Sequence, residues 1–124
     1  MSDYNNIAQQ FVGFYYNTFD TNRGGLSNLY RDDSMLTFET ASNLGAASIT
    51  EKLTSLPFSQ VQHQLATLDA QPSPDGSIIV LVTGALKVDD QPQPMNYTQT
   101  FVLKPDGAGS YYVHHDIFRI IYPA

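Results

Sequence analysis

Cysteine and tryptophan are both absent from this 124-residue chain. Without cysteine it can form no disulfide and no thiolate zinc site, and nothing in it indicates an oxidising compartment. Basic residues are also scarce, because six Lys and Arg stand against twelve Asp and Glu, giving a formal net charge of -6. Such a chain repels an exposed phosphate backbone, so nucleic acid is an unsuitable partner.

Long apolar runs are missing as well. No stretch approaches the roughly 20 apolar residues that a membrane span requires. The N-terminus "MSDYNNIAQQF" lacks the basic segment and the apolar core of a secretory signal. We therefore expect a soluble intracellular protein without membrane insertion. What is present, 42% hydrophobic residues with 8 Tyr and 7 Phe, suits one compact domain over residues 1–124.

Two segments have helical spacing. Residues 3–21 place apolar side chains at i, i+4, i+7 and i+8, with Asp3 available as N-cap. The expected apolar face consists of Ile7, Phe11, Phe14, Tyr15, Thr18 and Phe19. Residues 46–55 form the second predicted helix, which aligns Ile49, Leu53 and Leu56 and ends before Pro57.

Strand patterns follow the second helix. "FSQVQHQLATLDAQP" alternates with one polar side, and "SIIVLVTGALKV" is apolar on both faces with Gly84 inside it, which indicates a bulge or bend. "NYTQTFVLK" and "SYYVHHDIFRIIY" complete the set, and "SPDGS" and "PDGAG" provide turns. Helices first and consecutive strands afterwards predict an α+β fold. In it, a curved antiparallel sheet wraps around the N-terminal helices and encloses a cavity.

Several strings carry a family resemblance over most of the chain, from about Tyr4 to Tyr122. They are "FYYNTFD", "SMLTFE", "ITEKLTSLPF", "VQHQL", "LDAQPSPDG" and "HDIFR". In order and spacing they resemble the nuclear transport factor 2 family, particularly its fungal forms. The resemblance implies a cone-shaped subunit that dimerises with a second copy through its sheet.

The same resemblance implies a function. The family carries the GDP form of the small GTPase Ran into the nucleus and binds phenylalanine-glycine repeats of nuclear pore proteins. It has no known catalysis and no cofactor. The location implied is cytoplasm and nucleus, with concentration at the nuclear envelope and its pores.

The resemblance also implies a Ran-binding site at the mouth of the cavity. Glu39 and Asp89 match acids on its rim, and Asp90 adds an auxiliary charge. Residues that match the cavity lining are Phe38, Phe58, Leu86, Val88 and Phe118. Strand alternation, apart from the resemblance, points His63 inward with Val61 and Leu65, so His63 is expected to border the cavity. One further rim acid of some relatives is Gln91 here, which implies a weaker or reorganised ionic contact. From the residues alone, "DDQPQP" is typical of an ordinary solvated turn.

Two other surfaces are implied. Leu81 and Ile117 match positions in the sheet-to-sheet dimer interface. Tyr4 matches a position where relatives place Trp or Phe against the phenylalanines of pore repeats. Its alternative role is to staple the start of the first helix, and both readings stay open.

Other functions were weighed against a carrier. A metal site from His63, His114 and His115 is disfavoured, because neighbouring strand residues point to opposite faces. The main rival is a small-molecule isomerase or dehydratase of the same cone-shaped fold, in which His114 and Asp116 could pair as base and orienting acid. For a carrier we expect an apolar cavity without a close Asp/Tyr or Asp/His dyad. A dimerisation module attached to other domains is disfavoured because no residues remain for them.

Overall fold

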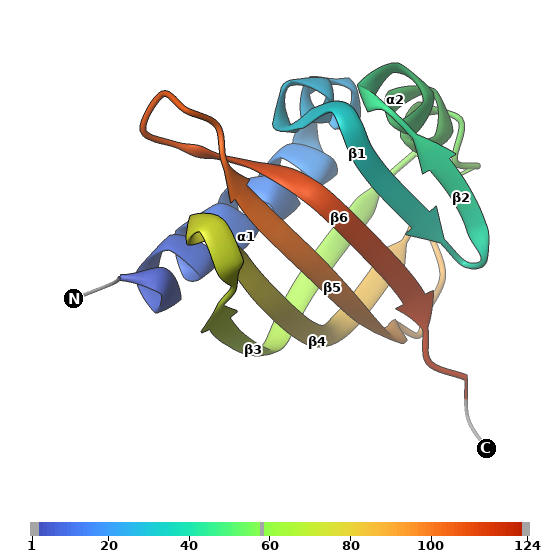
Figure 1. Ribbon diagram of the computed structural model, residues 1–124. Coiled ribbons are helices and arrows are strands. Elements are labelled where there is room, and N and C mark those ends of the chain that lie inside the picture. The colour runs from blue at the N-terminus through green and yellow to red at the C-terminus, as the bar shows by residue number, and fades with distance from the viewer. Residues whose placement is uncertain (1–2, 58, 123–124) are drawn as a thin grey trace.

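The computed structural model describes residues 3–57 and 59–122, and Figure 1 shows their arrangement. In chain order the elements are α1 (Tyr4–Thr21), the 3₁₀ helix η1 (Arg23–Leu29), β1 (Tyr30–Phe38), β2 (Ala41–Leu44), α2 (Ala46–Thr54), β3 (Val61–Pro72), the 3₁₀ turn η2 (Pro74–Gly76), β4 (Ile78–Val88), β5 (Met95–Pro105) and β6 (Tyr111–Ile120). No helix among these residues combines the length and the apolar character needed to cross a bilayer.

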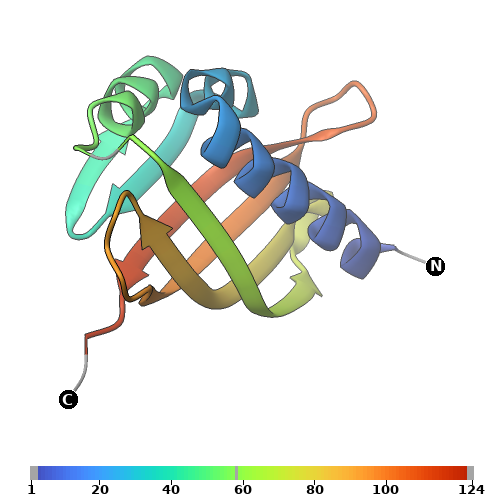
Figure 2. The ribbon, with the colours of Figure 1, turned by 180° about the vertical axis from the view of Figure 1, so that it is seen from behind.

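The strands form one curved, six-stranded sheet in the order β2-β1-β6-β5-β4-β3 (Figure 1). Figure 2 shows α1 lying across the sheet and α2 at one end of it. The predicted α+β class, with a curved sheet wrapped around helices, is confirmed. A wholly antiparallel sheet is wrong, however, because β1 pairs with β6 in parallel while the other four pairings are antiparallel.

The expectation that the helices precede all strands is also wrong. β1 and β2 form a hairpin between α1 and α2, with Phe38 opposite Ala41 at its turn. The two strands could not be recognised in the sequence, because buried and exposed residues do not alternate along β1. Its register with β6 shifts between Tyr30 and Met35, and three charged residues lie exposed in that interval. A bulge of this kind breaks the period of two by which a half-buried strand is recognised.

Helix α1 begins within one residue of its predicted start, but its buried face is rotated from the predicted one. The core side is formed by Ala8, Val12, Tyr15, Tyr16 and Phe19. Phe14, which the spacing placed inside, is 58% exposed. Asp3 holds the N-cap position without donating or accepting a side-chain cap bond. Helix α2 ends one residue before its predicted end and buries Ile49 and Leu53.

Gly84 marks the bend of the sheet, as its position inside a long strand predicted. A Cβ atom at this residue would lie 2.3 Å from the carbonyl oxygen of Gln64 and 3.0 Å from the ring of Tyr97. Opposite Gly84, the register of β3 shifts between Leu65 and Thr67. The bulge therefore ends the alternation predicted for β3, and Leu65, expected inside, is exposed.

Candidate functional site

A small cavity lies between the helices and the concave face of the sheet. Its lining consists of Tyr15, Phe19, Leu36, Phe38, Leu53, His63, Leu86, Gln99 and Phe118. Its volume is about 10 Å³, room for about one water molecule. Four of the predicted lining residues are in this set, whereas Val88 is buried outside it and Phe58 lies outside the described residues.

Two stacked rings form part of the lining. Phe38 and Phe118 are neighbours on the parallel strands β1 and β6, with centroids 4.7 Å apart and planes 4° from parallel. Phe118 is 3% exposed, while Phe38 is only partly buried and so is the outer ring. On its far side Phe118 stacks on Tyr97 at 5.3 Å. The stack therefore runs from the solvent side into the core.

The predicted rim acids come from loops at one end of the sheet. The β1–β2 hairpin and the loop from β4 to β5 both lie near the end of β6 (Figures 1 and 2). Glu39 is in the hairpin, and Asp89 and Asp90 begin the loop. Gln91 is exposed in the same loop, where its amide donates to the carbonyl of Val88.

The Glu39 carboxylate is held from several sides. Oε2 accepts a hydrogen bond from the amide of Ile120 at 2.9 Å, and Oε1 accepts one from the hydroxyl of Tyr122 at 2.9 Å. The Nε atom of Arg119 lies 3.6 Å from Oε2, and the Glu39 side chain is 24% exposed. This acid was predicted as a rim charge, and the structure adds that it ties the hairpin to the end of β6.

Asp89 also has a local role, through one carboxylate oxygen. Its Oδ1 accepts hydrogen bonds from the amides of Ser59 and Gln60, each at 2.9 Å. Among the described residues, none donates to Oδ2, and none forms a hydrogen bond or ion pair with the Asp90 carboxylate. Both side chains are exposed. The turn reading is thus correct for the backbone, while two carboxylates still face solvent.

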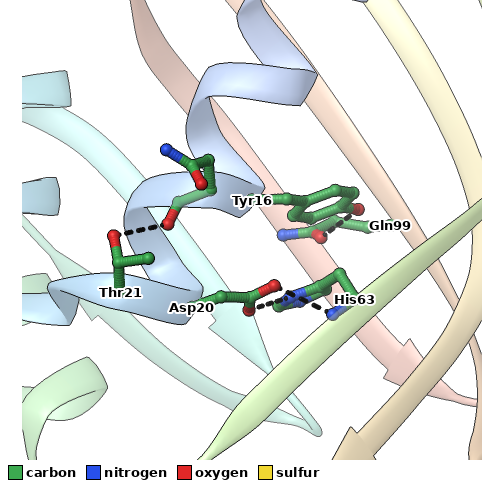
Figure 3. Close-up of polar contacts among 6 residues, drawn as sticks. Tyr16, Asp20, Thr21, His63 and Gln99 are labelled. Carbon is green, nitrogen blue, oxygen red and sulfur yellow. Dashed lines mark hydrogen bonds and ion pairs between the residues drawn. The ribbon is translucent and has the colours of Figure 1, made fainter.

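Figure 3 shows the carboxylate of Asp20 beside His63, a residue of the cavity lining. Asp20, near the end of α1, places Oδ1 at 2.7 Å from Nδ1 of His63, and its Oδ2 accepts the amide of His63 at 3.0 Å. The His63 ring stacks on Tyr16 with centroids 4.2 Å apart. His63 therefore borders the cavity as predicted, but in the form of an Asp/His pair.

A buried polar network lies deeper, around Asp116. Its Oδ2 accepts hydrogen bonds from the hydroxyls of Tyr15 at 3.0 Å and Tyr30 at 2.8 Å. Its Oδ1 accepts the side-chain amide of Gln99 at 2.7 Å, and Gln99 in turn accepts the hydroxyl of Tyr16 at 2.8 Å. Burial raises the pKa of Asp116 to about 6, although these hydrogen bonds oppose the shift.

The expectation of a cavity without a close Asp/Tyr or Asp/His dyad is therefore wrong. Asp116 with its tyrosines and Asp20 with His63 are both such groupings. The Asp116 carboxylate, however, is fully buried, accepts three hydrogen bonds and is not part of the cavity lining. A fully buried carboxylate with three hydrogen bonds, separated from the cavity by its partners Tyr15 and Gln99, has the character of a structural network.

The other histidines do not assemble a site. His114 places Nδ1 at 3.5 Å from Oδ2 of Asp33, which also accepts the Tyr112 hydroxyl. The pair of His114 and Asp116 that the enzyme reading would need is not formed. The register of β5 and β6 shifts at His114, and Asp116 bonds the tyrosines. Within residues 3–57 and 59–122, no group of three or more His, Asp or Glu side chains is arranged to hold a metal ion.

The outer face of the sheet carries an apolar surface. Leu81, Thr100 and Ile117 are cross-strand neighbours, and Leu81 and Ile117 are 46% and 49% exposed. A parallel row runs from Ile79 through Val102 and His115 to Met35 and Leu44. Exposed apolar surface of this extent is typical of a protein interface.

Tyr4 is the first residue of α1 and is partly buried against the core. Next to this end of α1 lies a shallow groove of about 550 Å³ between the helix and the β5–β6 hairpin. It is lined by Ile7, Gln10, Phe11, Phe14, Gly109, Ser110 and Tyr111. A staple residue precedes the N-cap, whereas Tyr4 follows the N-cap Asp3, so its position does not match the stapling role. The phenylalanine-binding role stays a proposal.

Sequence reasoning missed several residues of the cavity and network. Gln99 lies between inward Tyr97 and Phe101 in the alternation of β5, so its inward position had a signal. Tyr16 and Phe19 had the spacing of the α1 core face. Tyr30 had none, because the bulge in β1 separates it from the rest of the strand.

Comparison with known proteins assigns the family. The model of the nuclear transport factor 2 domain matches residues 7–120. The chain is 68% identical to nuclear transport factor 2 of Emericella nidulans over the whole of both chains. It belongs to the nuclear transport factor 2 family. The solved structure of nuclear transport factor 2 from Cryptosporidium parvum superposes with a TM-score of 0.92 at 43% identity, covering 95% of this chain and 94% of the other.

More distant structures share the fold without sharing the sequence. A protein from Novosphingobium aromaticivorans assigned as a scytalone dehydratase superposes with a TM-score of 0.83 at 13% identity, covering 98% of this chain and 89% of the other. This likeness concerns the fold alone, because one fold hosts unrelated chemistries. The full-length relative with 68% identity is named as a transport factor.

Proposed function

We propose that this chain is a nuclear transport factor that binds the GDP form of Ran and carries it into the nucleus through the pore. The observation that carries the proposal is the 68% identity, over full length, to a protein named nuclear transport factor 2. Carriers of this kind pass between cytoplasm and nucleus, so the chain is expected in both compartments and concentrated at the nuclear envelope.

The cavity is the proposed seat of an aromatic side chain of Ran. Aromatic anchors in dry pockets supply much of the energy of an interface, and rim charges steer and orient the partner. Here the pocket is lined by rings and aliphatic side chains, including Phe38, Leu86 and Phe118. With only about 10 Å³ free, an entering ring must displace a side chain. Phe38, the partly exposed member of the stack, is positioned to move.

The acids on the rim are proposed to meet basic residues of Ran. Asp89 and Asp90 are exposed, and each has at least one carboxylate oxygen that accepts no hydrogen bond from a described residue. Glu39 contributes from the opposite loop. Gln91 does not prevent this arrangement, because Asp90 offers a charge one residue away in the same loop.

Dimerisation and pore binding complete the proposal. The outer rows that contain Leu81 and Ile117 suit a symmetric contact in which each copy presents the same face.

Tyr4 is proposed to receive the phenylalanines of pore repeats. An alanine at this position is expected to weaken binding of a phenylalanine-glycine peptide and to leave Ran-GDP binding unchanged.

An import assay tests the carrier function directly. Permeabilised cells depleted of soluble factors receive fluorescent Ran-GDP with the parent chain or with Asp89→Asn. Nuclear accumulation that depends on the parent chain and falls with the variant supports the proposal. Accumulation that is the same without any added chain would contradict it.

One observation favours a second function, and it is the Asp116 network with its two tyrosines. An isomerase of this fold would need such a grouping to face its substrate. The small volume of the cavity and the three bonds on Asp116 argue against that use. Turnover of an enolisable ketone that is abolished in Asp116→Asn would establish the enzyme instead.

A further inference from the structure

The two rim acids are not equivalent, because one of them already has a cation beside it. Glu39 accepts hydrogen bonds on both oxygens and has Arg119 at 3.6 Å from Oε2. Asp89 accepts bonds on Oδ1 alone and forms no ion pair with a described residue. A basic partner would therefore find Asp89 open and Glu39 partly neutralised.

Arg119 is placed to act on that partner rather than on the core. Its side chain is 52% exposed and lies near the end of β6, beside Ile120, whose amide also donates to Glu39. The contact with Glu39 raises the pKa of Tyr122, and the charge of Arg119 opposes that rise. A cation approaching Glu39 meets one competing like charge, the Arg119 guanidinium 3.6 Å from Oε2.

We propose that Arg119 limits the affinity of the rim for its basic partner by competing for the carboxylate of Glu39. The inference rests on the proposed function, in which Glu39 contacts a basic residue of Ran. Arg119 is thus a positioning residue that acts through Glu39. The Ile120 amide and the Tyr122 hydroxyl hold the Glu39 carboxylate, and Arg119 weakens its attraction for a basic partner.

The expected effect is small and has a definite sign. Exposed ion pairs contribute little, so removing Arg119 should tighten Ran-GDP binding by about two- to fivefold. A purely structural role for Arg119 predicts the opposite, because loss of the pair would loosen the Glu39 side chain and weaken binding. The sign of the change therefore separates the two roles.

The experiment compares charge-matched variants of the full chain by calorimetry with purified Ran-GDP. Arg119→Gln removes the competitor, and Arg119→Lys keeps a cation in its place. Lys104→Gln is the control, because it makes the same change in net charge at the far end of β5, opposite Tyr112. Each variant is repeated in a Glu39→Gln background, and sedimentation confirms that assembly is unchanged.

The inference predicts tighter binding for Arg119→Gln, parental affinity for Arg119→Lys and Lys104→Gln, and no effect of Arg119→Gln once Glu39 is Gln. Equal tightening by Arg119→Gln and Lys104→Gln would show a net-charge effect and overturn it. Unchanged or weaker binding of Arg119→Gln, or tightening that persists in the Glu39→Gln background, would also overturn it. If the parent chain fails to bind Ran-GDP, the proposed function itself fails, and the inference with it.

Discussion

Gln60 and Asp89 are joined by two hydrogen bonds where β3 begins. The amide of Gln60 donates to Oδ1 of Asp89 at 2.9 Å, and the amide of Asp89 donates to the carbonyl of Gln60 at 2.8 Å. Asp89 has a φ of 47°, in the left-handed region that Asn and Asp occupy more readily than other side chains. One carboxylate oxygen thus fixes the turn, and the other is left for a partner.

This relationship predicts that Asp89→Asn and Asp89→Ala differ in stability. The Asn side chain keeps an oxygen for both amides and tolerates the backbone conformation, so its free energy of unfolding should stay within about 0.5 kcal/mol of the parent. Alanine removes the two hydrogen bonds that Oδ1 accepts from Ser59 and Gln60 and should cost about 0.5 to 2 kcal/mol, like the loss of a helix cap. Urea unfolding at pH 7 measures both values.

The same Asn variant should lose binding despite its stability. A charge removed from a desolvated contact can cost about 2 to 5 kcal/mol, so Ran-GDP affinity should fall at least tenfold. Binding of a phenylalanine-glycine peptide should be retained. Loss of both ligands would indicate general damage, and retention of both would leave Asp89 as a turn residue only.

The outer face predicts the assembly state. Leu81→Glu or Ile117→Glu places a charge in the proposed apolar interface, where burial without a partner is unfavourable. Both variants should sediment as monomers at micromolar concentration, while the parent is a dimer. Phe14→Glu is the matched control, since Phe14 is exposed on α1, away from the sheet face, and should remain dimeric. Dimers in both sheet variants would exclude this interface.

Gly84 and Gly13 predict opposite effects of the same substitution. In Gly84→Ala the new Cβ meets the backbone oxygen of Gln64 at 2.3 Å, so the bend must shift and stability should fall by about 1 to 3 kcal/mol or more. Gly13 lies in α1 with nothing within 4 Å of its Cβ position. Gly13→Ala should therefore stabilise the chain by about 0.5 to 1 kcal/mol. Thermal unfolding of the pair tests the geometry.

Asp116 predicts a pH dependence of stability. Its pKa is raised from 3.8 to about 6 by burial, so between these values the folded state holds a proton that the unfolded state has released. The contribution of Asp116 to the free energy of unfolding is fully present below about pH 4 and is lost as the pH rises through about 6. The loss amounts to about 3 kcal/mol, since one pKa unit corresponds to about 1.36 kcal/mol.

Asp116→Asn isolates that contribution, because the amide cannot ionise. As the pH rises from 4 to 7, the unfolding free energy of the parent should fall relative to that of the variant. Other carboxylates titrate equally in both chains and cancel in the difference. A difference that is constant with pH would contradict the account of Asp116.

The periodicity of apolar residues predicted those helices and strands whose pattern is uninterrupted. Helix α1 and strand β4 have long regular stretches, and the position of Gly84 in β4 indicated the bend. The rotation of the α1 face was missed because Ala8 and Val12 have the same spacing as the larger Phe11 and Phe14, and spacing alone does not choose between the two faces. Which side is buried depends on the shape of the sheet beneath it.

The site was less predictable than the fold. The resemblance indicated Phe38, Leu86 and Phe118, and strand alternation indicated His63; all four line the cavity. The Asp116 network was missed because its partners come from α1, β1 and β5, and no local spacing joins such distant residues. The bonds that hold Glu39 were missed for the same reason, since they arise only where the hairpin meets the end of β6.

Calorimetric titration of the purified chain with Ran, loaded with GDP in one experiment and with GTP in the other, tests the central proposal most directly. The account predicts saturable binding of the GDP form, one Ran per subunit, and binding of the GTP form at least tenfold weaker. Equal binding of the two forms, or no binding of the GDP form, would contradict it.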